Sequence, residues 1–177
     1  MARRVRRQLR GGRVVDLAAG HGLLAWTLLL LDDSSPEALC VDTRRPKSAQ
    51  RLQGALEERW PRLAGRVRYL EADLDTVAVE KGDLVVCAHG CGALTDRVLA
   101  KAVAARARVA VLPCCHRLGE RGAENARDHL LQAWLEPALA IDVERALKLE
   151  AAGYRVCAVA IPEEITPKNR LLLGDPR

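Results

Sequence analysis

Phenylalanine is absent from this sequence of 177 residues, and only three tryptophans and two tyrosines are present. Proteins that bind single-stranded nucleic acid by stacking need several aromatic side chains, so the composition counts against that mode of binding. Long apolar runs are missing too, since the run from Leu23 to Leu31 is much shorter than the roughly 20 residues that cross a membrane. We therefore expect no membrane association and a cytoplasmic location.

Cysteine is too scarce for a disulfide scaffold, with six residues in the whole chain. Three of them, Cys40, Cys87 and Cys157, stand in apolar segments typical of strands, where buried thiols are common. We expect the thiols to be reduced. An apolar content of 49% is enough for one substantial core, and we predict a single domain over residues 1–177.

Acidic side chains are outnumbered, with 23 against 28 lysines and arginines, which leaves a net charge of +5. Much of the excess lies near the start of the chain, at Arg3, Arg4, Arg6, Arg7, Arg10 and Arg13. We interpret residues 1–12 as a basic N-terminal arm. Two roles stay open for it, a solvated terminus and a segment that binds the phosphates of RNA.

One stretch, from Val14 to Gly22, organises the rest of the chain. A β-branched run ends in Asp16, small residues and two glycines follow, and an apolar run begins at Leu23, which predicts strand, tight turn and helix. Glycine lets the backbone turn sharply and approach a ligand closely, and a helix start offers unpaired N–H groups. A second acid, Asp42, ends the next predicted strand, where such folds place a carboxylate on ribose hydroxyls. The stretch therefore predicts a nucleotide cradle.

Strand and helix patterns alternate along the chain, which predicts an α/β fold with a doubly wound, seven-stranded, mostly parallel sheet and helices on both faces. The predicted strands cover residues 13–18, 37–42, 67–73, 83–89, 108–112, 154–162 and 169–174. The predicted helices cover residues 23–29, 46–60, 93–105 and 141–149, with a further helical stretch around 130–135 after a polar loop at 117–125.

Two acids at successive strand ends suit a cationic, ribose-bearing ligand better than a pyrophosphate, and with the Gly20-His21-Gly22 turn the chain resembles the class I, Rossmann-like methyltransferases that use S-adenosylmethionine (SAM). The resemblance implies SAM as cofactor and an antiparallel seventh strand. It also implies that Asp73, at the end of the third strand, contacts the adenine amino group. The cofactor-binding residues that it indicates are Asp16, Ala18, Gly20, His21, Gly22, Asp42, Thr43, Asp73, Leu74 and His89.

Two further motifs follow the fourth and fifth predicted strands, which are neighbours in that fold. The pattern His89-x-Cys91-Gly92-x-x-Thr95-Asp96, followed by Cys114-Cys115-His116, resembles a family of tRNA ribose 2′-O-methyltransferases and related methyltransferase-like proteins. The cysteine and histidine zinc-finger modules of the larger family member are missing here. The resemblance implies an acceptor that is RNA, with tRNA as one possibility.

Four roles stay open for the histidines and cysteines of these motifs. In the first role, the thiols are small buried side chains. In the second, His89 or His116 is a general base that takes a proton from the acceptor. A zinc site from His89, Cys91, one of Cys114 and Cys115, and His116 is the third, and a thiolate nucleophile at Cys114 is the fourth. We expect His89 and His116 to be the catalytic residues and expect no metal.

Other functions also stay open for the whole chain. The acceptor is a small molecule in one alternative, and the chain is a non-catalytic subunit that binds RNA or a partner protein in another. An NAD-dependent oxidoreductase would share the glycine turn and Asp42, but the third glycine of the dinucleotide fingerprint is missing. A protein partner or a homodimer is a further expectation.

Overall fold

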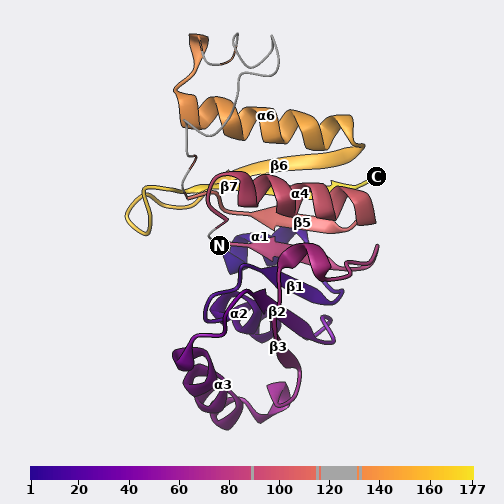
Figure 1. Ribbon diagram of the computed structural model, residues 1–177, viewed down its shortest axis with the longest axis vertical. Helices are drawn as coiled ribbons and strands as arrows, with labels where there is room; N and C mark the ends of the chain where they lie inside the picture. The colour runs from indigo at the N-terminus through magenta and orange to yellow at the C-terminus, as the bar shows by residue number, and fades with distance from the viewer. Residues whose placement is uncertain (89, 115, 117–130, 132) are drawn as a thin grey trace.

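The computed structural model describes residues 1–88, 90–114, 116, 131 and 133–177 (Figure 1). Its helices are α1 (Ala2–Gln8), α2 (Leu23–Leu31), α3 (Lys47–Arg59), α4 (Ala93–Ala105) and α6 (Pro137–Ala151). Its strands are β1 (Val14–Leu17), β2 (Ala38–Asp42), β3 (Val67–Glu71), β4 (Leu84–Cys87), β5 (Arg108–Val111), β6 (Tyr154–Ala160) and β7 (Arg170–Pro176). Two 3-10 turns, η1 (Pro61–Leu63) and η2 (Leu74–Thr76), follow α3 and β3.

The strands form one sheet in the order β3-β2-β1-β4-β5-β7-β6. All neighbouring pairs among the first five strands are parallel, whereas β7 is antiparallel to both β5 and β6. Asp16 on β1 is in register with Cys40 on β2 and with Val86 on β4. The strands β1 to β5 therefore end at one side of the sheet, which we call the carboxyl edge.

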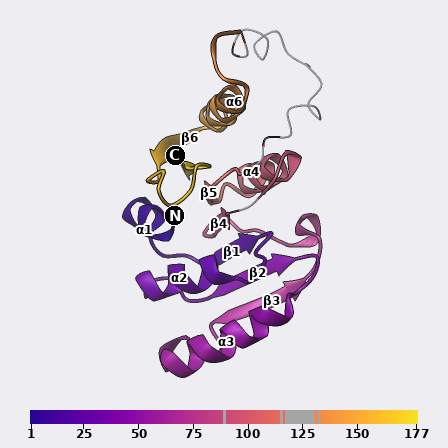
Figure 2. The ribbon, with the colours of Figure 1, turned by 90° about the vertical axis from the view of Figure 1, so that its left-hand side faces the viewer.

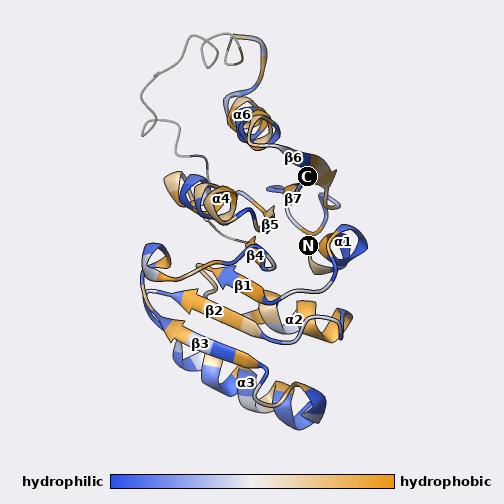
Figure 3. Ribbon diagram, turned by 90° about the vertical axis from the view of Figure 1, so that its right-hand side faces the viewer, coloured by the Kyte–Doolittle hydropathy of each residue, from blue (hydrophilic) through white to orange (hydrophobic). Residues whose placement is uncertain are grey.

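Helices cover both faces of the sheet because alternate strand residues point to opposite sides (Figure 2). Val14, Cys40 and Val86 belong to one core with α1 and α2, and the partly buried apolar side chains of α3 pack against it. Val15, Val85 and Val109 belong to a second core with α4 and α6. In the hydropathy colouring the strands and α2 are mostly apolar, whereas α3 carries many hydrophilic residues (Figure 3).

The predicted fold class is confirmed, and all seven predicted strands are present in the predicted order. The boundaries differ by a few residues. The helix predicted from Ile141 starts at Pro137, because the side chain of Glu136 accepts hydrogen bonds from the N–H groups of Ala138 and Leu139 and so caps the first turn. The loop predicted at 117–125 lies outside the described residues, as does part of the helical stretch at 130–135.

Residues 2–8 form a helix where we expected a basic arm. Val5 is fully buried against α2, and the side chain of Arg6 is buried with it. The Arg6 guanidinium forms an ion pair with Asp32 at 3.2 Å and donates to the carbonyl of Leu28 and the hydroxyl of Ser35. Arg6 is thus a structural residue that holds α1 to the end of α2.

The arginines near the start of β1 lie at the amino-terminal side of the sheet, opposite the carboxyl edge. Arg13 donates to both oxygens of Asp83, which precedes β4, at 3.0 and 2.6 Å. Arg10 forms an ion pair with Asp32 at 3.2 Å. Across the described residues, none of the helices has the length and apolar character that a membrane span requires.

Candidate active site

The order of the strands reverses between β1 and β4, and open α/β sheets bind their ligands at the carboxyl edge beside such a point. The loop of residues 18–22 leaves β1 there. Ala18, Gly20 and Gly22 all adopt left-handed backbone angles, with φ of 57°, 54° and 77°. Positive φ at these residues lets the chain turn tightly between β1 and α2.

Neighbouring strands hold this loop in place. The N–H of Ala19 donates to the carbonyl of Val41, and the N–H of Gly20 donates to Asp42 Oδ2 at 2.8 Å. The hydroxyl of Tyr69 on β3 donates to the carbonyl of Gly20 at 2.7 Å. Burial, together with the nearby charge of Asp42, raises the pKa of Tyr69 to about 12, so this donor keeps its proton at neutral pH.

The two glycines of the turn have different surroundings. A Cβ atom at Gly22 would lie 2.9 Å from Cys40 Sγ, so the loop packs against β2 at this point. A Cβ atom at Gly20 would meet nothing within 4 Å, so the loop faces open space there. The loop is therefore closed on its sheet side and open at Gly20, as a cradle for a ligand must be.

Asp16 lies behind the loop rather than in the open cradle. Its side chain is 1% exposed and accepts a hydrogen bond from the N–H of Ala25, in the first turn of α2, at 3.3 Å. Burial raises the pKa of Asp16 to about 7, and the charge of Asp42 adds to the effect. Asp16 thus fixes the position of α2 relative to the loop.

Asp42, unlike Asp16, is partly exposed beside the glycine loop. It ends β2 and is half-buried, and while Oδ2 accepts from Gly20, Oδ1 accepts from the hydroxyl of Thr43 at 3.4 Å. Thr43 and His21 are exposed on the same side of the sheet. The contact between this strand-end carboxylate and ribose hydroxyls stays a prediction.

Asp73 and Leu74 follow β3 at the carboxyl edge. Asp73 is exposed, caps η2 by accepting from the N–H of Asp75 at 2.9 Å, and forms an ion pair with Arg97 at 2.6 Å. The N–H of Asp75 and the guanidinium of Arg97 hold the pKa of Asp73 below its usual value. Leu74 is buried in the core beneath. The sequence reasoning missed Arg97, because it lies 24 residues away on α4.

The described residues of the first motif span the turn after β4 and the first turn of α4. The hydroxyl of Thr95 donates to the carbonyl of Gly90, and a Cβ atom at Gly90 would lie 2.9 Å from Cys87 Sγ. Cys91, in the same turn, has its Sγ 3.2 Å from the Sγ of Cys114, which follows β5. The two motifs therefore meet at the carboxyl edge, as predicted. His89 and Cys115 lie outside the described residues.

Arg145 of α6 joins this turn to the rest of the protein. Its side chain is 1% exposed and donates to both oxygens of Asp96, at 2.9 and 3.1 Å, and to the carbonyl of Gly92 at 3.0 Å. A further contact reaches Asp142 at 3.3 Å. Asp96, the acid of the first motif, thus holds α6 against the turn after β4. The sequence reasoning missed Arg145.

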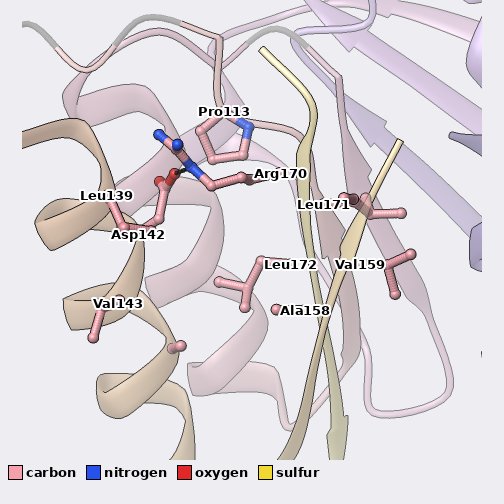
Figure 4. A pocket seen from close by; sticks show the side chains of 11 residues that line it. Pro113, Leu139, Asp142, Val143, Ala158, Val159, Arg170, Leu171 and Leu172 are labelled. Atoms are coloured by element: carbon pink, nitrogen blue, oxygen red, sulfur yellow. Dashed lines mark hydrogen bonds and ion pairs between the residues drawn. The ribbon is translucent and has the colours of Figure 1, made fainter. Parts of the chain in front are cut away.

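His116, from the second motif, belongs to the same network. Its Nε2 lies 2.8 Å from Asp142 Oδ1, and its side chain is only 4% exposed. Asp142 also accepts from Arg170 Nε at 2.7 Å. Asp142 and Arg170 lie at one side of a mostly apolar pocket between α6 and the β6–β7 pair, with Pro113 beside them (Figure 4). A buried carboxylate therefore fixes the orientation of His116.

The described residues contain no group of three or more histidine, cysteine, aspartate or glutamate side chains placed to hold a metal ion. Two of the ligands that the sequence offered for zinc, His89 and Cys115, are outside the described residues.

A family model described as a methyltransferase domain matches residues 1–120, which include the glycine loop, both strand-end acids and both motifs. The chain belongs to this family. A relative from Drosophila pseudoobscura pseudoobscura, the glutathione S-transferase C-terminal domain-containing protein homolog, is 27% identical over 199 residues, covering 93% of this chain and 33% of the relative. The methyltransferase chain thus spans about a third of the length of that relative.

Solved structures share the fold of this methyltransferase domain. An O-methyltransferase family protein from Burkholderia thailandensis aligns with a TM-score of 0.60 and 18% identity over 99% of this chain and 57% of that chain. A candidate rRNA methylase from Clostridium thermocellum aligns with a TM-score of 0.60 and 13% identity over 98% of this chain and 92% of that chain.

Family and fold together identify SAM as the cofactor of this methyltransferase domain. The geometry fits it, since the loop is open at Gly20 and Asp42 stands at the end of β2 beside it. When bound, SAM supplies an electrophilic methyl group on a sulfonium.

Proposed function

We propose that this domain transfers the methyl group of SAM to an RNA acceptor, with tRNA as the first class to test. SAM binding is supported chiefly by the hydrogen bond between the Gly20 N–H and Asp42. This bond connects the open glycine loop to the carboxylate at the end of β2. In this assignment Ala18, Gly20, His21 and Gly22 form the cradle, with Asp16 behind it.

The other cofactor contacts follow from their places along the carboxyl edge. Asp42 accepts from the ribose hydroxyls, with Thr43 beside it. Asp73 accepts from the adenine amino group, with Leu74 packed beneath. Arg97 holds Asp73 in place through their 2.6 Å ion pair. His89, two residues after the end of β4 in the sequence, is the remaining residue that we assign to the cofactor.

We assign the general base to His89, because in the sequence it follows β4, the strand that pairs with β1 beside the cradle. Neutral imidazole accepts a proton near pH 7, as a hydroxyl or amine acceptor requires while the methyl group moves. His116 is buried and bonded to Asp142, so we assign it a positioning role behind the β5 turn. Methyl transfer otherwise depends on in-line placement of the acceptor.

RNA is supported by the net charge of +5 and by the two motifs that resemble the tRNA ribose methyltransferase family. Basic side chains also lie at the carboxyl edge, where Arg44 and Lys47 follow β2 and are exposed. Phosphates would contact such side chains and make binding sensitive to salt.

A small-molecule acceptor is the second candidate, and the N-terminal arginines favour it. Arg6, Arg10 and Arg13 form ion pairs with Asp32 or Asp83, away from the carboxyl edge. They are therefore poorly placed to bind the phosphates of an acceptor at the site.

The test has two stages. Calorimetric titration with SAM, S-adenosylhomocysteine and NAD should give micromolar binding of the first two and none of the third. Methyl-labelled SAM is then supplied with total RNA, purified tRNA, nuclease-digested RNA and a small-molecule extract. Methyl label that appears in intact RNA, but not in digested RNA or in the extract, would support the proposal. Label that appears only in the small-molecule extract would favour the second candidate instead.

A pair of variants tests the assignment of the base. His89→Ala should lower kcat strongly and leave the SAM dissociation constant unchanged. His116→Ala should have the smaller effect on kcat and a larger effect on the melting temperature, because it removes a buried partner of Asp142. The reverse ranking would exchange the two roles.

A further inference from the structure

Two thiols face each other at the carboxyl edge. Cys91 follows β4 and Cys114 follows β5, both are half-buried, and their sulfur atoms are 3.2 Å apart. A disulfide has an S–S bond of about 2.05 Å, so the two sulfurs need to approach by only about 1 Å. Both residues lie in turns, and Cys91 stands between Gly90 and Gly92. The turns after β4 and β5 would have to supply this approach.

The surroundings of these two cysteines distinguish them from the structural ones. Cys40 and Cys87 are 1% exposed and belong to the two cores, and Cys157 packs against the first core from β6. Burial raises the pKa of the Cys40 thiol far above its usual value, which makes it unreactive. Within the described part of the chain, Cys91 and Cys114 belong to neither core.

We propose that Cys91 and Cys114 are a reversible redox site that a hydroperoxide converts to a disulfide. The thiolate of one cysteine attacks the peroxide oxygen, the O–O bond breaks, and a sulfenic acid forms with release of water or an alcohol. The second thiol attacks the sulfenic sulfur, the S–S bond forms and water leaves. Two electrons pass from the two sulfurs to the peroxide, and a dithiol reductant returns them.

The bond would join the turns after β4 and β5, which enclose the acceptor side of the site. The proposed function places the acceptor beside the turn that follows β4, so a bond at Cys91 would change that side of the site. The glycine loop and Asp42 are on other strands and keep their mutual hydrogen bond. Oxidation should therefore slow methyl transfer severalfold and leave the affinity for SAM unchanged.

The test begins with the reduced full chain treated with hydrogen peroxide, followed by alkylation of the remaining thiols and mass measurement. We expect the oxidised chain to carry two fewer alkyl groups than the reduced chain, and a dithiol to restore both sites of alkylation. Tryptic cleavage should leave residues 82–97 joined to residues 109–117. Each of these peptides holds two cysteines, so variants must assign the bond.

Cys91→Ser and Cys114→Ser should each abolish the joined peptides, whereas the matched control Cys157→Ser, also half-buried, should keep them. Joined peptides that persist in Cys91→Ser, or oxidation that stops at sulfinic acid, would overturn the proposal. Zinc that is present in the purified protein and is released on oxidation would replace it with a metal site.

Activity is a separate measurement. A disulfide that forms without slowing methyl transfer would overturn the regulatory role. A reduced protein that transfers no methyl group to any acceptor would instead count against the proposed function, because the disulfide itself is detected by mass.

Discussion

The N–H of Gly20 and the carboxylate of Asp42 are joined by a hydrogen bond of 2.8 Å, which connects the open part of the glycine loop to the end of β2. Asp42→Ala removes both this support and the carboxylate that would accept from the ribose. We expect the affinity for SAM to fall at least tenfold, about 1.4 kcal/mol, with little loss of stability because Asp42 is half-buried at a strand end.

Calorimetry with SAM checks this expectation, and thermal unfolding shows whether the variant is folded. Asp175→Ala provides the control, since Asp175 pairs with Arg155 on the surface of β7 and β6, far along the sheet order from β2. Equal SAM affinity in the two variants would remove Asp42 from the site.

Alanine variants of three glycines distinguish the stability cost of backbone strain from a loss of affinity for SAM. Gly20, Gly22 and Gly65 all have positive φ, so alanine at any of them costs about 1 kcal/mol. Gly22→Ala also brings a Cβ atom to 2.9 Å from Cys40 Sγ, and we expect a total loss near 3 kcal/mol. Gly20→Ala meets nothing within the protein and should fold, but it should bind SAM at least tenfold more weakly.

Gly65→Ala is the matched control, because it has the same strain and the same open space but follows η1, away from the cradle. Urea unfolding and SAM titration of all three variants check the prediction. If Gly20→Ala and Gly65→Ala bind SAM equally well, the open side of the loop is not where the ligand lies.

Asp16 should make stability depend on pH. Its pKa is about 7 in the folded protein and 3.8 in an exposed chain, because burial disfavours the charged form. Between these values the folded chain holds a proton that the unfolded chain has released. The free energy of unfolding therefore falls as pH rises from about 4 to about 7, by a contribution of the order of 4 kcal/mol.

Asp16→Asn cannot lose this proton, and its stability curve should lack that contribution. The difference in unfolding free energy between the native protein and the variant, measured by urea titration at several pH values, isolates the effect from other titrating groups. Parallel curves across the whole range would contradict the raised pKa.

Arg145 should contribute strongly to stability. Arg145→Met removes a buried guanidinium that donates charge-assisted hydrogen bonds to Asp96 and Asp142, which are themselves partly exposed, and we expect a loss of about 2 kcal/mol. Arg155→Met is the control, because its 2.7 Å pair with Asp175 is exposed and should cost less than about 1 kcal/mol. Similar losses in the two variants, measured by urea unfolding, would show that the network at Arg145 is not specially stabilising.

Local patterns in the sequence were sufficient to predict the sheet. Buried strands show as runs such as Val85-Val86-Cys87, and glycine or proline marks the turns between them. The meeting of the two motifs also followed, because parallel strands end at one edge. Cys91 and Cys114 are brought together there.

Interactions between distant segments could not be predicted in this way. Arg145 pairs with Asp96 across 49 residues, and nothing in either local sequence marks the pair. The helix α1 did leave a signal, since Ala2, Val5 and Leu9 recur at helical spacing and are all buried. The surrounding arginines suggested a solvated segment and obscured this pattern.

The place of β7 in the sheet has a consequence for synthesis of the protein. β7 is the last strand made, yet it lies between β5 and β6, so β5 has an unpaired side until residues 170–176 leave the ribosome. An open strand of apolar residues is a template for pairing with other chains. Nascent or truncated chains that end before β7 should therefore aggregate or occupy chaperones, whereas chains that include it close the sheet.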